Sequence, residues 1–342
     1  MAACPNRSPF LEHRTQGTAL KLTHLSLRTN LLGFSPGHMA WMLLVGSLLL
    51  SPCGWADVEA QDEQQIFLSL VDRTGAPVTD ITLEEVTIQE DGQPRDTLRV
   101  EPVDWPTKLT VIVDNSQATS NALVQLRNGL RGLFEELPAG VEMSLLTLAP
   151  QPRWIARPTR DRQKVIESIG LLAPDSGAAK FLDALVEAGN RIAKDEGRHF
   201  PIILIVGSDG IEGSSVIERD IERLVKQMVQ HAVTLHVVMI ARGGRRTLSN
   251  TGANQVQVGI GLTQMTNGRY ENIAASTRLT SLLPELGKLI GESHLRQSQQ
   301  FRITYSRPRL SYQRPGGPQI TATTTRPGLT GILTFDGRIP QP

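Results

Sequence analysis

Short apolar runs alternate with longer amphipathic segments through the middle of the chain. The apolar runs, each compact enough for a strand buried on both faces, span 109–113, 143–148, 202–206 and 233–240. The segments with apolar residues at helical spacing span 122–137, 161–172, 181–194 and 216–231. This alternation predicts a doubly wound α/β fold, in which a mostly parallel sheet carries helices on both faces.

The pattern becomes less regular after the fourth apolar run. Residues 241–257 look irregular because glycine, arginine and asparagine are frequent there. A short helix is predicted over 260–266, a further strand at 269–270 and a last helix over 278–294. We therefore place the central domain at 105–294.

Both flanks of this domain have a different, β-rich pattern. In the N-terminal β-rich segment, 62–104, a strand begins at Ile66 and Thr82 opens a short helical turn with capping-box spacing. Asp91-Gly92 suits a tight hairpin before a strand at 97–100. In the C-terminal β-rich extension, 295–342, strand-like runs lie among prolines and glycines at 301–305, 320–324 and 329–335. We expect the two flanks to pack together as a small β-rich module.

The N-terminal segment 1–56 is typical of a signal peptide. Basic residues precede the apolar run 40–50, and a breaker and small residues follow it up to Ala56. The run is too short for a stable transmembrane anchor, which needs about 20 residues. Met39 stands directly before the run and is a candidate for the true start. We expect an exported protein, periplasmic or extracellular, which loses both cysteines on cleavage.

Candidate chemistry lies where two predicted strands end. Asp114 and Ser116 follow the first strand of the central domain, and Asp209 follows the strand at 202–206. In an open parallel sheet, ligands bind beyond the carboxyl ends of the strands. These three side chains offer only oxygen atoms, which hard divalent cations prefer. The near-neutral formal charge of +1 gives no reason to expect nucleic acid as a partner.

These residues resemble a known family over about 107–293. Asp114 and Ser116 match the first two positions of the Asp-x-Ser-x-Ser loop in the metal-ion-dependent adhesion site of von Willebrand factor type A domains. Asp209 in its Ser-Asp-Gly turn matches the third loop of that site, and 177–185 resembles the second loop and the helix after it. The resemblance implies a Rossmann-like fold and non-enzymatic binding of a protein or peptide, through an acidic side chain that completes the coordination of Mg²⁺ or Mn²⁺.

The chain departs from the family pattern at two positions. Ala118 stands where the family has the second serine of the first loop, and Ala179 stands where it has the threonine. Two hydroxyl ligands are therefore missing, which leaves Asp114, Ser116 and Asp209 as a reduced metal site. Alternatively, the two aspartates only cap helix N-termini. Nearby oxygen-bearing residues that are candidates to replace the missing ligands are Thr119, Ser120, Asp175 and Ser176.

The N-terminal flank carries a second resemblance. The run 71–78, the segment 83–86 and the Glu90-Asp91-Gly92 turn resemble the leader of a bacterial group of secreted proteins related to the von Willebrand factor type A family. That resemblance implies no catalytic activity. A metal-independent scaffold with a vestigial site is the first alternative function.

An uncharacterised α/β enzyme is the second alternative. Residues 207–210 lack the Gly-x-Ser-x-Gly spacing of a hydrolase, and no dinucleotide-binding glycine pattern follows the first strand of the domain. His236 lies inside an apolar run and is expected to be a hydrogen-bonded core residue. Trp105 and Trp154 are expected to bury the junctions between the units of the chain.

Overall fold

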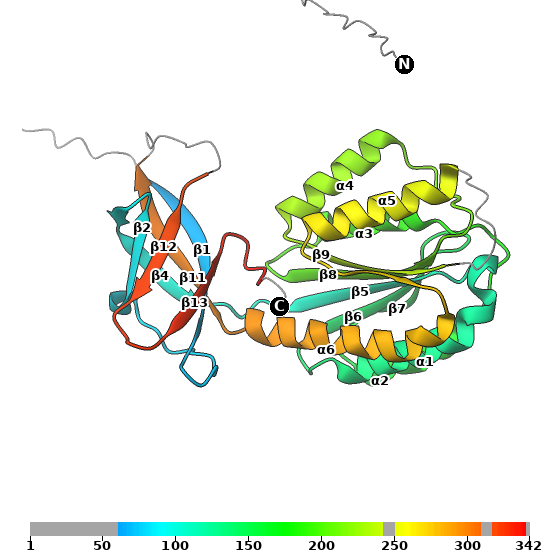
Figure 1. The fold of residues 1–342 in the computed structure, drawn as a ribbon, viewed down its shortest axis with the longest axis horizontal. Helices are drawn as coiled ribbons and strands as arrows, with labels where there is room; N and C mark the ends of the chain where they lie inside the picture. Colours follow the sequence, from blue (N-terminus) through cyan, green and yellow to red (C-terminus); the bar gives the residue numbers. More distant parts are fainter. Residues whose placement is uncertain (1–60, 242–249, 309–316, 340–342) are drawn as a thin grey trace, which may run out of the picture. The chain divides into compact units, whose positions relative to one another are not determined.

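The central sheet has six strands in the order β10-β9-β8-β5-β6-β7 (Figure 1). The strands from β10 to β6 pair in parallel, and β7 runs antiparallel to β6. The strands are β5 Thr107–Val113, β6 Glu142–Thr147, β7 Arg153–Thr159, β8 Phe200–Ser208, β9 Thr234–Ile240 and β10 Tyr270–Ile273. The doubly wound, mostly parallel sheet is as the sequence predicts.

Helices cover both faces of this sheet. The helices α1 Leu123–Glu136, α2 Arg162–Ser168 and α6 Leu279–Gln297 pack on one face. The helices α3 Phe181–Lys194, α4 Glu218–Gln230 and α5 Asn250–Met265 pack on the other. Short 3₁₀ turns are η2 Gln117–Ala122, η3 Ile169–Leu171 and η4 Ser276–Arg278. The apolar faces that the helical spacing predicts form two cores, one on each side of the sheet.

This computed structural model describes residues 61–241, 250–308 and 317–339. The predicted signal peptide at 1–56 and both cysteines lie outside the described residues. Among the described helices, none is long and apolar enough to cross a membrane.

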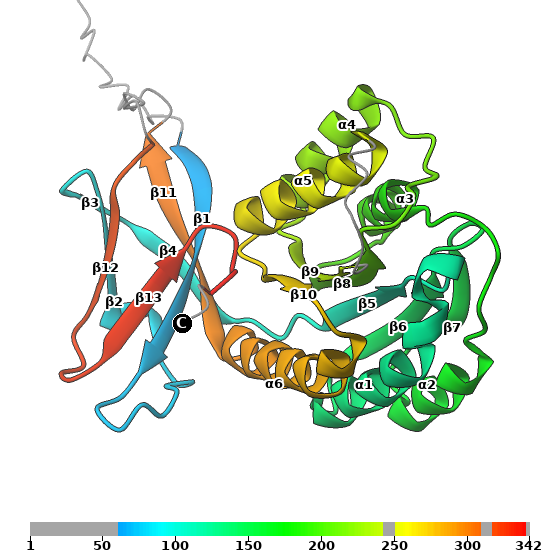
Figure 2. The same ribbon diagram turned by 45° about the vertical axis from the view of Figure 1, so that its right-hand side comes forward.

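Two elements of the central domain differ from the prediction. Strand β7 was not predicted, because arginines and Pro158 interrupt its apolar pattern. Its pairing with β6 shifts register twice, and such irregularity, with proline and charge, protects an exposed edge from pairing with other chains (Figure 2). Helix α5 begins at Asn250, so the prediction of an irregular stretch up to 257 was wrong. Buried Gln255 and the half-buried Val256 and Val258 pack this helix on the sheet despite its glycines.

The two flanks form a β-sandwich of two sheets, ordered β13-β1-β11-β4 and β12-β2-β3. Its apolar residues, among them Ile66, Ile88 and Ile303, are buried between the sheets. Strands from both flanks pair in each sheet, as expected. The elements are β1 Gln61–Val71, η1 Leu83–Glu85, β2 Val86–Glu90, β3 Gln93–Arg95, β4 Thr97–Pro102, β11 Gln300–Pro308, β12 Ile320–Thr324 and β13 Thr330–Thr334.

The hairpin of this module differs from the prediction in its second strand. Asp91 and Gly92 adopt φ angles of 52° and 78°, which suits the tight turn that their sequence predicts. The strand that follows is the short β3, whereas β4 pairs with β11 in the other sheet. The prediction of a hairpin between β2 and residues 97–100 was therefore wrong.

Aromatic side chains link this module to the central domain. The Trp105 ring centroid lies 5.3 Å from that of Phe67 in β1 and 5.4 Å from that of Phe200 in β8. Val103 is buried in the same cluster. Trp105 therefore covers the junction, as expected.

His236 is a buried core residue of β9, as the sequence predicts. Its side chain is 1% exposed, and its Nδ1 accepts a hydrogen bond from the Arg269 backbone N–H at 3.1 Å. Burial, with a smaller effect of the Arg269 charge, lowers the pKa of His236 from 6.5 to about 4. The folded protein therefore keeps this ring neutral at pH values where the unfolded chain protonates it.

This pKa shift predicts a loss of stability in acid. As the pH falls from about 7 to 4, the unfolded state gains a proton that the folded state does not, and the free energy of unfolding decreases by about 3 kcal/mol. Urea denaturation at pH 7.5, 6 and 5 would measure this slope. A His236→Gln variant should show a shallower slope, although burial also lowers the pKa of His199 and His294. Equal slopes in both proteins would contradict the assignment to His236.

Candidate functional site

The candidate site is built where the strand order reverses, between β5 and β8. Asp114 directly follows β5 and is fully buried. Its Oδ1 accepts a hydrogen bond from the Ser116 backbone N–H at 2.8 Å, and its Oδ2 accepts one from the Ser208 hydroxyl at 2.7 Å. The ends of β5 and β8 are thus joined through one carboxylate, and Ser208 is a residue that sequence reasoning missed.

The first loop continues through the 3₁₀ turn η2. Ser116 is its N-cap, and the Ser116 Oγ accepts a hydrogen bond from the Ala118 N–H at 3.3 Å. Thr119 is buried, and its hydroxyl donates to the carbonyls of Asp114 at 2.8 Å and Ser116 at 3.2 Å. Thr119 was a candidate replacement ligand, but its hydroxyl instead holds the loop backbone.

Asn115 ties three loops together and was also missed. Its Oδ1 accepts from the Ala149 N–H at 3.0 Å, and its Nδ2 donates to the Ala173 carbonyl at 3.1 Å. Its own carbonyl accepts from the Asp175 N–H at 2.7 Å. An asparagine after a strand is a weak signal, because only the fold shows that the loops after β5, β6 and η3 meet there.

The second loop lies against the third. Ala179 is buried, and its carbonyl accepts a hydrogen bond from the Gly213 N–H at 2.7 Å. The Asp175 carboxylate accepts from the Gly177 N–H at 2.7 Å, within its own loop. At the position of the family's threonine, the chain therefore offers a buried methyl group.

Asp209 starts the third loop and is half-buried. Gln255 of α5 lies directly against this loop, and its Nε2 donates to the carbonyls of Ser208 at 2.8 Å and Gly210 at 3.2 Å. Burial and, to a lesser extent, the Asp209 carboxylate raise the pKa of Tyr270. Sequence reasoning could not find Gln255, because the composition of its segment predicts an irregular stretch.

Asp114 does not cap a helix N-terminus. Ser116 is the N-cap of η2, and the helix after Asp209 begins only at Glu218. The alternative prediction of a helix cap was therefore wrong for Asp114. The structure instead brings Asp114 and Ser116 into direct contact and places Asp209 next to Ser208, which binds Asp114.

Comparison with known proteins gives the family of this domain. Residues 109–212 match the von Willebrand factor type A domain. The chain contains a von Willebrand factor type A domain. Such domains are in general protein-interaction modules and generally non-enzymatic. No curated protein matches the chain.

Several solved structures are similar in fold. A von Willebrand factor type A protein from Catenulispora acidiphila is 10% identical with a TM-score of 0.45, and the match covers 80% of this chain and 74% of that one. The SpRpn10 VWA domain is 19% identical with a TM-score of 0.40, and the match covers 52% of this chain and 94% of that domain. The conserved hypothetical protein BatB from Bacteroides thetaiotaomicron is 13% identical with a TM-score of 0.39, and the match covers 53% of this chain and 98% of that one.

Glu212 fastens the third loop of the type A domain to helix α3. Its carboxylate accepts hydrogen bonds from the backbone N–H groups of Phe181 at 3.3 Å and Ser214 at 2.9 Å. Burial raises the pKa of Glu212, against the lowering effect of these hydrogen bonds. Glu212 thus accepts a hydrogen bond from the N-terminus of α3 and positions the loop that begins at Asp209.

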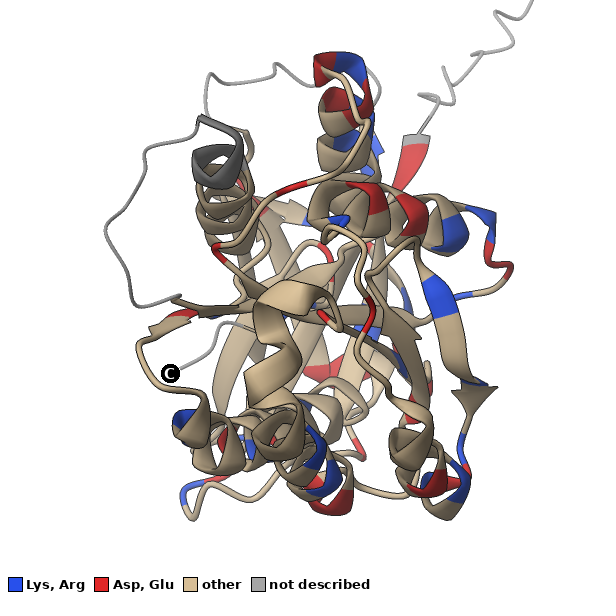
Figure 3. Cartoon of the chain, turned by 90° about the vertical axis from the view of Figure 1, so that its right-hand side faces the viewer, with Lys and Arg blue, Asp and Glu red and all other residues tan. Residues whose placement is uncertain are grey.

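The loop end of the type A domain carries acidic positions in front of the sheet, whereas many basic positions lie on the surrounding helices and on the outer strand (Figure 3). Among the described residues, no three histidine, cysteine or acidic side chains form a metal-ligating group. The candidate set is smaller: two carboxylates, Asp114 and Asp209, and the hydroxyl of Ser116.

Proposed function

We propose that the chain is a non-enzymatic binding protein that recognises a protein or peptide partner at the carboxyl ends of β5 and β8. The hydrogen bond between Ser208 and Asp114, 2.7 Å long, carries the proposal because it sets the two acidic loops side by side. Asp114, Ser116 and Asp209 are the residues that we assign to recognition. The predicted signal peptide supports export to the periplasm or beyond, which is part of the same proposal.

The donor set fits a weakly held Mg²⁺ or Mn²⁺. Each carboxylate oxygen of Asp114 accepts one hydrogen bond, from Ser116 or from Ser208, and has a second lone pair for an ion. Magnesium retains several waters and needs few protein ligands, so the loss of hydroxyls at Ala118 and Ala179 lowers affinity without removing the oxygen set. When bound, the ion would supply positive charge to which an acidic side chain of the partner binds.

Titration of the purified protein with Mg²⁺ and Mn²⁺ by isothermal calorimetry tests this proposal. We expect saturable binding with a dissociation constant in the millimolar range, because two family ligands are absent. In an Asp114→Ala, Asp209→Ala double variant, we expect binding to disappear. The matched control is Glu218→Ala, an exposed carboxylate at the start of α4, which should leave binding unchanged.

A metal-independent scaffold is the second candidate. It is favoured by Ser208, whose hydroxyl donates a hydrogen bond to the Asp114 carboxylate and so occupies a lone pair that a metal ion could otherwise use. The absence of saturable metal binding would contradict the metal-assisted proposal and leave this candidate. Partner binding that persists in a chelating buffer would support it directly.

A further inference from the structure

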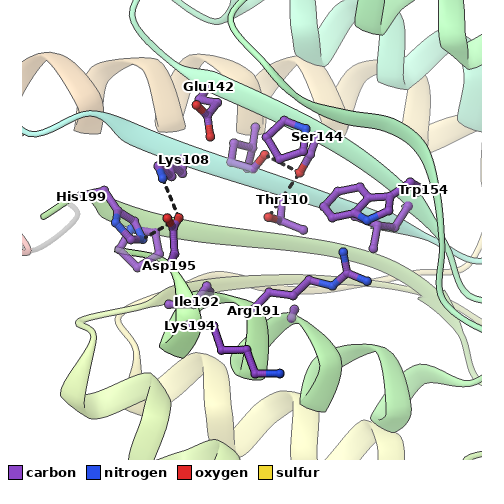
Figure 4. Close-up of a pocket in the computed structure, with 15 residues that line it drawn as sticks. Lys108, Thr110, Glu142, Ser144, Trp154, Arg191, Ile192, Lys194, Asp195 and His199 are labelled. Atoms are coloured by element: carbon purple, nitrogen blue, oxygen red, sulfur yellow. Dashed lines mark hydrogen bonds and ion pairs between the residues drawn. The ribbon is translucent and has the colours of Figure 1, made fainter. Parts of the chain in front are cut away.

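A cavity of about 450 Å³ lies away from the candidate site of Asp114, Ser116 and Asp209, between the sheet and helix α3 (Figure 4). Strands β5, β6 and β7 supply its floor, and α3 with the segment that leads into β8 supplies its wall. We call it the α3 groove. The residues used below are Lys108, Thr110, Glu142, Ser144, Leu146, Trp154, Arg191, Ile192 and Asp195.

The chemistry of the floor changes along the strands. The parallel register sets Lys108 beside Glu142 and Thr110 beside Ser144. Two residues further along β6, Leu146 pairs with Trp154 of β7. Because side chains two apart on a strand share a face, the floor passes from charged to hydroxyl to apolar over about 13 Å.

The charges around the floor leave one carboxylate unpaired. The Lys108 Nζ lies 2.5 Å from the Asp195 Oδ2, and Arg191 pairs with Glu187 at 2.7 Å. Among the described residues, the side chain of Glu142 makes no hydrogen bond or ion pair, although it is half-buried. The floor beside Ser144 therefore carries a carboxylate without a partner, whereas Lys194, a further cation of the lining, is exposed and points away from the floor (Figure 4).

The neighbouring hydroxyls are only loosely engaged. The Ser144 Oγ lies 3.3 Å from the Thr110 Oγ1 and 3.4 Å from the Leu109 carbonyl oxygen, longer than usual for hydroxyl hydrogen bonds. Ser144 is also nearly fully buried. Both hydroxyls can turn toward a donor at the groove floor and accept its hydrogen bonds.

The far end of the groove is apolar and aromatic. Trp154 lies there with the Arg191 guanidinium 4.4 Å from its ring centroid, so the expectation that Trp154 covers a junction between units was wrong. Leu146 and Ile192 are buried beside it. This end suits a hydrocarbon chain.

We propose that the α3 groove binds a primary ammonium group carried on an apolar stem. An ammonium has three N–H donors, which match the Glu142 carboxylate and the hydroxyls of Thr110 and Ser144. The stem lies over Leu146 and Ile192 toward Trp154. A free alkylamine and a lysine side chain of a peptide share this chemistry.

Calorimetric titration of the full chain with n-hexylamine, beside 1-hexanol, tests the proposal without any variant. We expect saturable binding of the amine and at least about tenfold weaker binding of the alcohol, because the charged hydrogen bond to Glu142 is lost. Equal affinity for the two, or no saturable binding of the amine, would overturn the proposal. Titration with N-acetyl-lysyl-leucine amide identifies the source: tighter binding than hexylamine indicates a peptide lysine, and weaker binding indicates a free amine.

A Glu142→Gln variant tests the assigned carboxylate. It keeps the shape of the side chain, and we expect it to weaken hexylamine binding at least about tenfold. The matched control is Glu218→Gln on α4, outside the groove, which should not change the affinity. Unchanged binding in the Glu142 variant, with an unchanged melting temperature, would exclude Glu142 as the ligand.

Discussion

Replacement of Gly268 by alanine is expected to lower the free energy of unfolding by more than about 3 kcal/mol. A Cβ at this position would lie 1.6 Å from the backbone oxygen of Leu235 in β9, a contact that only a backbone shift relieves. The Gly268 N–H also donates to the Thr263 carbonyl at 2.9 Å and closes helix α5. Urea denaturation followed by circular dichroism measures the loss.

The matched control for this prediction lies within helix α5, which ends before Gly268. A Cβ at Gly261 of α5 would have no neighbouring atom within 4 Å, so alanine meets no contact there. We expect Gly261→Ala to raise the free energy of unfolding by about 0.5–1 kcal/mol, because alanine favours the helix. A Gly268→Ala variant as stable as the Gly261→Ala variant would contradict the close approach to β9 as a constraint at Gly268.

The second large effect is expected at Glu90 in the β-sandwich. Its side chain is 1% exposed and bridges Arg95 of β3 at 3.1 Å and Arg307 of β11 at 2.9 Å. Glu90→Ala leaves two largely buried arginines without their counter-charge. It also removes the ion pair between β2 and β11, which belong to different sheets of the sandwich. We expect a loss of about 3–5 kcal/mol in the free energy of unfolding, measured by urea denaturation.

An exposed ion pair of the same module is the control. Glu63 pairs with Arg99, and their side chains are 55% and 50% exposed. Because water screens this pair, Glu63→Ala should cost less than about 1 kcal/mol. A Glu90→Ala loss no larger than the Glu63→Ala loss would refute the role assigned to the buried bridge.

The central sheet and most helices could be predicted because their signals are local. The run 202–206 lies within β8, all of which is buried, and 181–194 coincides with α3, whose apolar face packs on the sheet. Strand β7 and the start of α5 could not be predicted, because arginine, proline and glycine obscure their periodicity. Their structure depends on neighbouring strands that are distant in sequence.

The acidic residues of the candidate site could be predicted, but the residues that hold its loops in place could not. Asp114 and Asp209 follow strands, which the sequence shows. The hydrogen bonds of Asn115 and Ser208 join segments that are far apart in the chain, so no local pattern reveals them. The same holds for Glu142 and Thr110, which share a groove only because β5 and β6 pair in register.

The β-sandwich takes strands from both sides of the type A domain, and this has a consequence for the order of folding. During synthesis β1 emerges first, but its partner β11 begins only at Gln300. The type A domain is complete before that point and can fold while neither edge of β1 is yet paired, because β11 and β13 have not been synthesised. A nascent chain that stalls before Gln300 would therefore hold a folded domain beside an aggregation-prone strand, which chaperones would have to shield until β11 arrives.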